Sequence, residues 1–199
     1  MTADVTELDQ TIGFTIPARN ARGRLVRLGP VLDEILAAHA YPPAIEGLLA
    51  EALTLTALIG STLKDPLGQL TIQAQTQAGV VKLLVCDYRG GELRGYVQFH
   101  ADRLAEAPEE PTLFALFGEG YLAITFDLAG TGERYQGIVP LDGETLAAAA
   151  ESYFAQSEQI PSIVRLSARK DDHGWVAGGL MFQHLPEGEE GRERLHTRL

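Results

Sequence analysis

The sequence predicts an α+β fold, because strand patterns gather in consecutive runs around one long apolar helix. Residues 44–63 carry charges only at Glu46 and Glu51 before Lys64, and beyond Glu51 they are apolar or small on every side. A helix that is apolar all round is a buried helix. We therefore expect this helix to be covered on two faces. The 199 residues, 45% of them hydrophobic, suffice for one sizeable domain or two small ones without disulfide or metal staples.

The N-terminal region predicts a short tail followed by strands. Residues 1–10 have little to bury and are expected to form a loose tail. Residues 11–28 alternate in polarity, with interruptions at Pro17 and Gly23. This stretch also holds four arginines, Arg19, Arg22, Arg24 and Arg27. We interpret them as the charged solvent face of an edge strand, with a basic nucleic-acid arm as the alternative.

Helical spacing of apolar residues predicts a helix over residues 31–39. Tyr41-Pro42-Pro43 ends it, because proline cannot continue a helix and restricts the residue before it. Pro43 then suits the first position of the 44–63 helix.

The middle of the chain predicts β-structure. Polarity alternates with a period of two over 70–77, and glycine-rich turns lead into runs at 80–86 and 93–99. These three segments predict a three-stranded meander. An acidic loop over 101–111 and a short apolar helix or turn over 113–117 are expected next.

Further strands are predicted over 121–128 and 134–139, around the turn Gly130-Thr131-Gly132. Asp142 suits the N-cap of an alanine-rich helix over 146–154.

A last hairpin over 162–168 and 175–183 completes the predicted core. Residues 187–199 are charged and have no apolar face. The predicted organisation is therefore a tail at 1–10, a core domain at 11–186 and a charged segment at 187–199.

Charge and composition narrow the function classes. The net charge of −11, from 27 acids and 16 bases, argues against binding to nucleic acid or to an anionic membrane. The single cysteine excludes an internal disulfide and a cysteine-based zinc site. The first ten residues lack the apolar region of a signal peptide, and the apolar stretch at 48–63 is short for a bilayer. We expect a soluble cytoplasmic protein.

Few residues suggest chemistry. Cys86 ends an apolar strand with no assignable base nearby and is interpreted as an inert core thiol. The five histidines, His39, His100, His173, His184 and His196, show no metal-ligand spacing and are interpreted as surface residues, with His184 left open. No Gly-x-Ser-x-Gly nucleophile motif is present.

Two further patterns have structural interpretations. Gly118-Glu119-Gly120 and Gly130-Thr131-Gly132 lack the context of a phosphate loop and are interpreted as turns. Ser157, Glu158 and Gln159 are interpreted as capping a helix end through backbone hydrogen bonds. No catalytic, cofactor-binding or metal-binding residue is assigned, we expect no enzyme, and the substrate-binding residues stay unknown.

Eight motifs, in order, resemble the redox-regulated chaperones of the thirty-three-kilodalton heat-shock protein family. They are RGRLVRL (22–28), YP (41–42), GLLAEALTLTALIGSTLK (47–64), LTIQAQ (70–75), LRGYV (93–97), YQGIVPL (135–141), YFAQSEQIP (153–161) and AGGLMFQHLP (177–186). Each is weak alone, but their common order and spacing over nearly the whole chain are highly specific.

The resemblance implies a three-layer core in which two β-sheets enclose the central helix. It also implies an ATP-independent holdase that binds unfolding client proteins under oxidative stress, and a tendency to form homodimers. In that family, a linker and a C-terminal domain with four zinc-bound cysteines cover the client-binding surface until oxidation releases the zinc.

The sequence departs from the family at this switch. The four zinc cysteines are absent, and Cys86 matches none of them. We expect residues 187–199 to be the start of the linker of a truncated chain, rather than a natural member without the switch, and no cofactor is expected here. Two other classes stay open: a ligand-binding domain or small-molecule enzyme on the same fold, and an acidic module that pairs with itself.

Overall fold

The computed structural model describes residues 8–141 and 143–185, which form two antiparallel sheets and several helices. The four-stranded sheet has the order β1-β2-β9-β8, formed by Gln10–Ile16, Ala21–Leu28, Gly174–His184 and Ser162–Asp171. The five-stranded sheet has the order β5-β4-β3-β6-β7, formed by Glu92–Phe99, Val81–Arg89, Gln69–Gln75, Tyr121–Leu128 and Glu133–Pro140. The helices are α1 (Pro30–Ala37), α2 (Pro43–Gly60), α3 (Ala101–Ala105), α4 (Leu113–Phe117) and α5 (Leu146–Tyr153).

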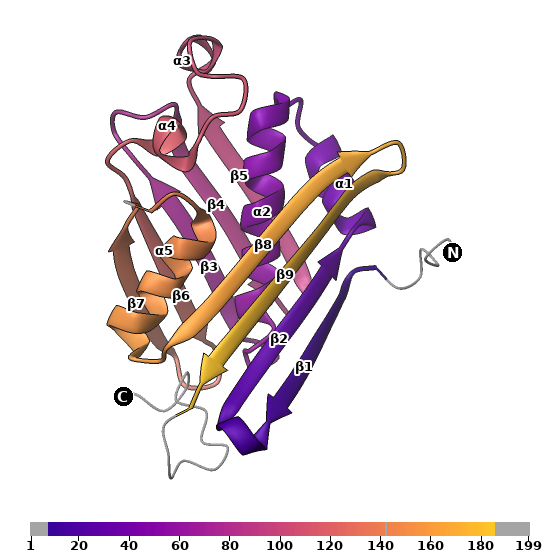
Figure 1. Cartoon of the computed structure of the whole chain (residues 1–199), viewed down its shortest axis with the longest axis vertical. Helices are drawn as coiled ribbons and strands as arrows, with labels where there is room; N and C mark the ends of the chain where they lie inside the picture. Colours follow the sequence, from indigo (N-terminus) through magenta and orange to yellow (C-terminus); the bar gives the residue numbers. More distant parts are fainter. Residues whose placement is uncertain (1–7, 142, 186–199) are drawn as a thin grey trace.

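Helix α2 lies between the two sheets, and this confirms the predicted α+β fold with a buried central helix (Figure 1). It contacts β2, β8 and β9 on one side and β3, β4 and β5 on the other. Pro43 is its first residue, as the sequence predicted. The meander β3-β4-β5 and the hairpin β8-β9 are also confirmed.

The hydroxyl groups on α2 are satisfied inside the helix itself. Thr54 Oγ1 donates to the carbonyl of Ala50, and Thr56 Oγ1 donates to that of Ala52, each over 2.7 Å. Buried hydroxyls without such partners would destabilise the core. By length and composition α2 is also apolar enough to cross a membrane, contrary to the expectation from residues 48–63. Its enclosure between two sheets accounts for that apolarity.

Several local expectations are wrong. Residues at the start of the predicted acidic loop form helix α3. The N-cap of α5 is Thr145, whose hydroxyl accepts a hydrogen bond from the Ala148 N–H; the predicted cap, Asp142, lies outside the described residues. Strand β2, which carries three of the four N-terminal arginines, is an inner strand between β1 and β9 and not the predicted edge.

The folded region begins before residue 11. The carboxylate of Asp9 accepts hydrogen bonds from the N–H groups of Gly29 (2.8 Å) and Val31 (3.1 Å) and so caps the start of α1. Gln10 is the first residue of β1. The predicted tail at 1–10 thus includes two residues, Asp9 and Gln10, that belong to the folded region.

Candidate functional site

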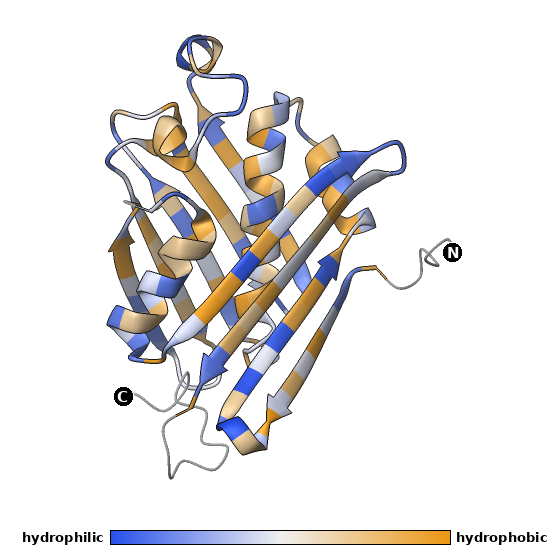
Figure 2. Ribbon diagram, in the orientation of Figure 1, coloured by the Kyte–Doolittle hydropathy of each residue, from blue (hydrophilic) through white to orange (hydrophobic). Residues whose placement is uncertain are grey.

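Figure 2 shows apolar residues alternating with polar ones along the strands of the four-stranded sheet. On the outer face of this sheet, directed away from α2, each strand contributes at least one apolar side chain, beside Arg27 of β2 and Arg165 of β8. The register pairs Ile12 of β1 with Leu25 of β2, which pairs with Leu180 of β9. One pleat further along, Phe182 of β9 pairs with Ile163 of β8. The members of this apolar outer face are Ile12, Phe14, Ile16, Leu25, Ile163, Leu180 and Phe182.

Much of this apolar outer face is open to solvent. Ile12 and Ile163 are each 51% exposed, and Leu180 is 37% exposed. The rings of Phe14 and Phe182 lie 6.4 Å apart, so aromatic contact extends from β1 to β9 across β2. Scattered apolar residues on a surface are normal, but a connected set over four strands indicates a binding surface.

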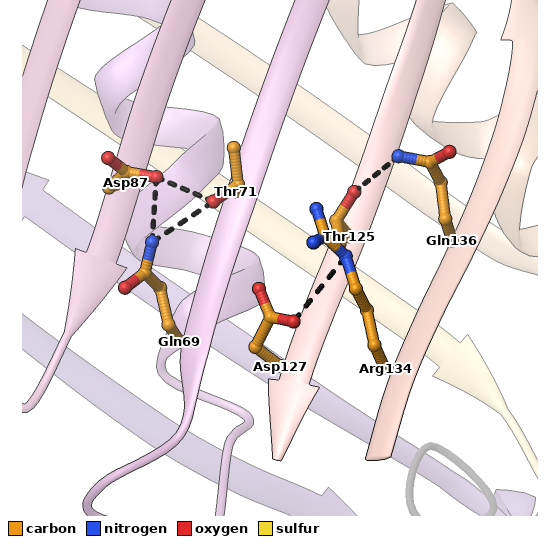
Figure 3. Close-up of polar contacts among 7 residues, drawn as sticks. All are labelled: Gln69, Thr71, Asp87, Thr125, Asp127, Arg134 and Gln136. Atoms are coloured by element: carbon orange, nitrogen blue, oxygen red, sulfur yellow. Dashed lines mark hydrogen bonds and ion pairs between the residues drawn. The ribbon is translucent and has the colours of Figure 1, made fainter. Parts of the chain in front are cut away.

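The outer face of the five-stranded sheet differs, because polar side chains there bond to one another (Figure 3). Asp87 accepts hydrogen bonds from Gln69 Nε2 (3.1 Å) and from the hydroxyl of Thr71. Gln136 Nε2 donates to Thr125 Oγ1 over 2.8 Å, and the nearby Arg134 and Asp127 form an ion pair. Polar groups already paired in this way offer little to a partner. Ile138 and Tyr96 are also exposed on this face, but Gln73 of β3 lies between them in the register. We therefore take the apolar outer face of the four-stranded sheet as the candidate site.

The motifs at 135–141 and 153–161 meet in the structure. The ring of Tyr153 lies against Gly137 of β7, and a Cβ on this glycine would come within 2.3 Å of it. The buried Tyr153 hydroxyl donates to Glu158 Oε1 over 2.8 Å. Burial, followed by the charge of Glu158, raises the pKa of Tyr153. The prediction that Glu158 hydrogen-bonds to neighbouring backbone is therefore wrong, because its carboxylate bonds to the side chain of Tyr153.

The turn between α5 and β8 has a conformation that the sequence did not predict. Residues Phe154–Glu158 form a π-helical turn, η3, which ends at Gln159 in a left-handed conformation. The Ile160 N–H donates to the carbonyl of Phe154. Together with the Tyr153–Glu158 bond, this makes the YFAQSEQIP motif a structural element that secures α5 against β7.

Cys86 is fully buried beside the hydroxyl of Thr56 on α2. Burial raises the pKa of its thiol strongly, and the Thr56 hydrogen bond offsets this only in part. Since the thiolate is the reactive form, we expect Cys86 to resist a thiol reagent such as DTNB in the folded chain at pH 8 and to react fully in guanidinium. Rapid labelling of the folded chain would contradict an inert core thiol.

The other candidate residues stay apart. His173 and His184 are exposed and His39 and His100 are partly exposed, while His196 lies outside the described residues. Gly118 ends α4, and Gly132 lies in the β6–β7 turn, each with a positive φ. Within 8–141 and 143–185, no group of three or more His, Cys, Asp or Glu side chains is placed to bind a metal ion. The residues described therefore do not fit the family's zinc site.

An open pocket of about 640 Å³ lies where the start of α2 approaches those of α4 and α5. Four carboxylates line it, those of Glu51, Glu109, Glu110 and Glu144. Neither a histidine nor Glu158 is among the residues that line this pocket. Burial raises the pKa of Glu51 on α2.

We expect Glu51→Gln to stabilise the fold at pH 7.5. A pKa raised by folding means that the ionised carboxylate destabilises the native state; this cost decreases as the pH falls through the raised pKa of the folded chain and is lost below the ordinary pKa of the unfolded chain. The gain is on the order of 0.5 kcal/mol, since solvent still screens the group. Thermal unfolding at pH 7.5 and 4.5 measures it. Glu34→Gln, at an exposed position of helix α1, is the matched control, and an equal gain there would contradict the burial effect.

Comparison with known proteins gives a consistent result. Residues 9–199 match the family model described as Hsp33 protein. The chain is 43% identical over 198 residues to a 33 kDa chaperonin of Caulobacter vibrioides (strain NA1000 / CB15N), covering 95% of this chain and 65% of the relative. It is 38% identical over 186 residues to a 33 kDa chaperonin of Yersinia pestis (strain Pestoides F), covering 93% and 61%.

A solved structure agrees with these relatives. The crystal structure of a 33 kDa chaperonin (Heat shock protein 33 homolog) from Thermotoga maritima matches with a TM-score of 0.74 and 25% identity, over 90% of this chain and 62% of that one. The chain thus spans a little under two thirds of the length of these relatives. On the family match and the relatives together, the chain belongs to the Hsp33 family of chaperones.

Proposed function

We propose that this chain is an ATP-independent holdase core that binds unfolded polypeptides on the apolar outer face of the four-stranded sheet. The observation that carries the proposal is the connected set of seven apolar side chains, four of them more than a third exposed. Full burial of one such side chain contributes about 1.5–3 kcal/mol, so partial contact with several gives useful affinity without a fixed sequence.

The proposal also covers the cellular location, the oligomeric state and the regulation of the protein. We place the protein in the cytoplasm as a homodimer, acting under oxidative stress as the family resemblance implies. The net charge of −11 would help to keep complexes with clients in solution. In the residues described, the one thiol is buried, so we propose that client binding by this chain needs neither oxidation nor zinc release.

A client aggregation assay tests the proposal. Chemically denatured citrate synthase is diluted into buffer with the purified chain, without ATP, and light scattering is recorded. We expect suppressed scattering that is equal in hydrogen peroxide and in dithiothreitol. Unchecked aggregation would refute the holdase function, and activity only after peroxide would refute the unregulated form.

A further inference from the structure

Strand β1 is an open edge of the four-stranded sheet, unlike the edges at β8 and β5. Among residues 8–141 and 143–185, β2 is its one pairing partner. At the β8 edge, the Val164 N–H donates to Glu151 Oε1 over 2.7 Å. At the β5 edge, the Val97 N–H donates to the Tyr41 hydroxyl over 3.0 Å. Side chains from neighbouring elements thus occupy a donor at each of those edges, which is a common protection against strand pairing.

The register shows which groups of β1 are open. The carbonyl of Asn20, just before β2, accepts a hydrogen bond from the Leu185 N–H on the β9 side. The backbone groups of successive residues point to opposite sides of an antiparallel strand. Ala21, the residue after Asn20, therefore bonds to its partner Ile16 on β1. Following the pairing along β1, the N–H and C=O groups of Thr11, Gly13 and Thr15 point away from β2.

The side chains of β1 favour, rather than block, an added strand. Residues 10–16 contain no charge and no proline, the usual protective features of an edge. On one side, Ile12 and Phe14 continue the apolar outer face. On the other side the guanidinium of Arg24 lies across Gly13, where a Cβ would come within 1.9 Å of Arg24 Nη1.

We propose that β1 is a strand-addition site for an extended segment of a non-native polypeptide. The segment pairs with Thr11, Gly13 and Thr15 as a fifth strand, directs apolar side chains along the outer face and places polar or acidic ones near Arg24. This inference rests on the proposed holdase function and specifies how a client is recognised. Main-chain pairing is independent of side-chain identity, which suits a chaperone with many clients.

Methylated peptides test the pairing directly. The probe is a fluorescent seven-residue peptide in which isoleucine alternates with glutamate, so that the acids face Arg24. One analogue carries N-methyl groups on the amides that would bond to β1, and a second carries them on the intervening amides. By fluorescence anisotropy, we expect the first analogue to bind at least tenfold more weakly than the parent peptide and the second to bind nearly as well.

A variant of the chain tests the same pairing from the other side. Thr15→Pro removes an outward N–H and leaves the β1–β2 ladder bonds in place, as proline is tolerated at such edge positions. We expect at least tenfold weaker peptide binding, whereas Thr15→Val, the matched control, keeps the N–H and the affinity. If Thr15→Pro does not fold, amide exchange in the unaltered chain replaces it. The N–H groups of Thr11, Gly13 and Thr15 should then exchange at least tenfold more slowly with peptide bound.

Three outcomes would overturn the inference, and they are distinguishable. Equal binding of both methylated analogues, with citrate synthase still protected, means contact with the face alone and leaves the proposed function intact. Loss of a dimer in Thr15→Pro on sedimentation, with unchanged peptide affinity, assigns the edge to a second copy of the chain. Failure to protect any client removes the basis of both proposals.

Discussion

The double variant Ile163→Asp/Leu180→Asp is expected to lose client capture while it keeps its fold. Both side chains lie on the apolar outer face and are more than a third exposed, so the core loses little when they change. A client loses roughly 1.5 kcal/mol of contact at each site, about 3 kcal/mol in all, which weakens binding about 100-fold. Light scattering of denatured citrate synthase and thermal unfolding measure the two effects.

The other sheet supplies the matched control. Ile138 of β7 is 57% exposed and, like Ile163, lies on an edge strand. Ile138→Asp makes the same chemical change at similar exposure and should protect the client as well as the unaltered chain does. An equal loss of protection in Ile138→Asp, or full activity in the double variant, would mean that clients bind elsewhere.

Addition of a single methyl group in Gly137→Ala is expected to destabilise the fold by about 3 kcal/mol. The new Cβ would lie 2.3 Å from Cε2 of Tyr153 and 2.7 Å from Oγ of Ser157. The tyrosine ring is buried and rigid, so relief requires movement of α5 and strain on the hydroxyl bond to Glu158. The melting temperature should fall by roughly 6–12 °C, measured by circular dichroism.

Gly178→Ala is the matched control, because this strand glycine on β9 has only the Val26 carbonyl within 4 Å, at 3.8 Å. We expect its stability to stay within about 0.5 kcal/mol of the unaltered chain. If Gly137→Ala and Gly178→Ala had the same melting temperature, the contact between the two motifs would not hold α5 in place.

The sequence predicted the core elements well because each has a local periodic signal. Helix α2 is apolar on every side, and β3 alternates residue by residue. Pairing of β2 with β9 joins residues as far apart as Arg22 and Gln183, and no local pattern encodes such a contact. Capping was misassigned because Asp142 and Thr145 are both residue types that cap helices, and the cap is the one directly before the first helical residue, Leu146.

The apolar outer face was not located from sequence, although a signal was present. Leu180, Met181 and Phe182 are consecutive apolar residues, and a strand with a period of two then has apolar side chains on both faces. Only the structure shows that Met181 faces the core, that Leu180 is 37% exposed and that Phe182 lies on the same outer face beside Phe14. The π-helical turn η3 had no signal of this kind.

If clients bind the apolar outer face as proposed, alternate residues of β9 serve stability and client capture, and this affects how its sequence can diverge. On that proposal, we expect substitutions at Leu180 or Phe182 to alter which polypeptides are retained, while the core-facing Met181 stays unchanged. Deletion of one residue earlier in β9 would rotate every later side chain to the opposite face and exchange the two roles. Evolution of client preference on this strand should therefore proceed through replacements at fixed length, and not through insertions or deletions.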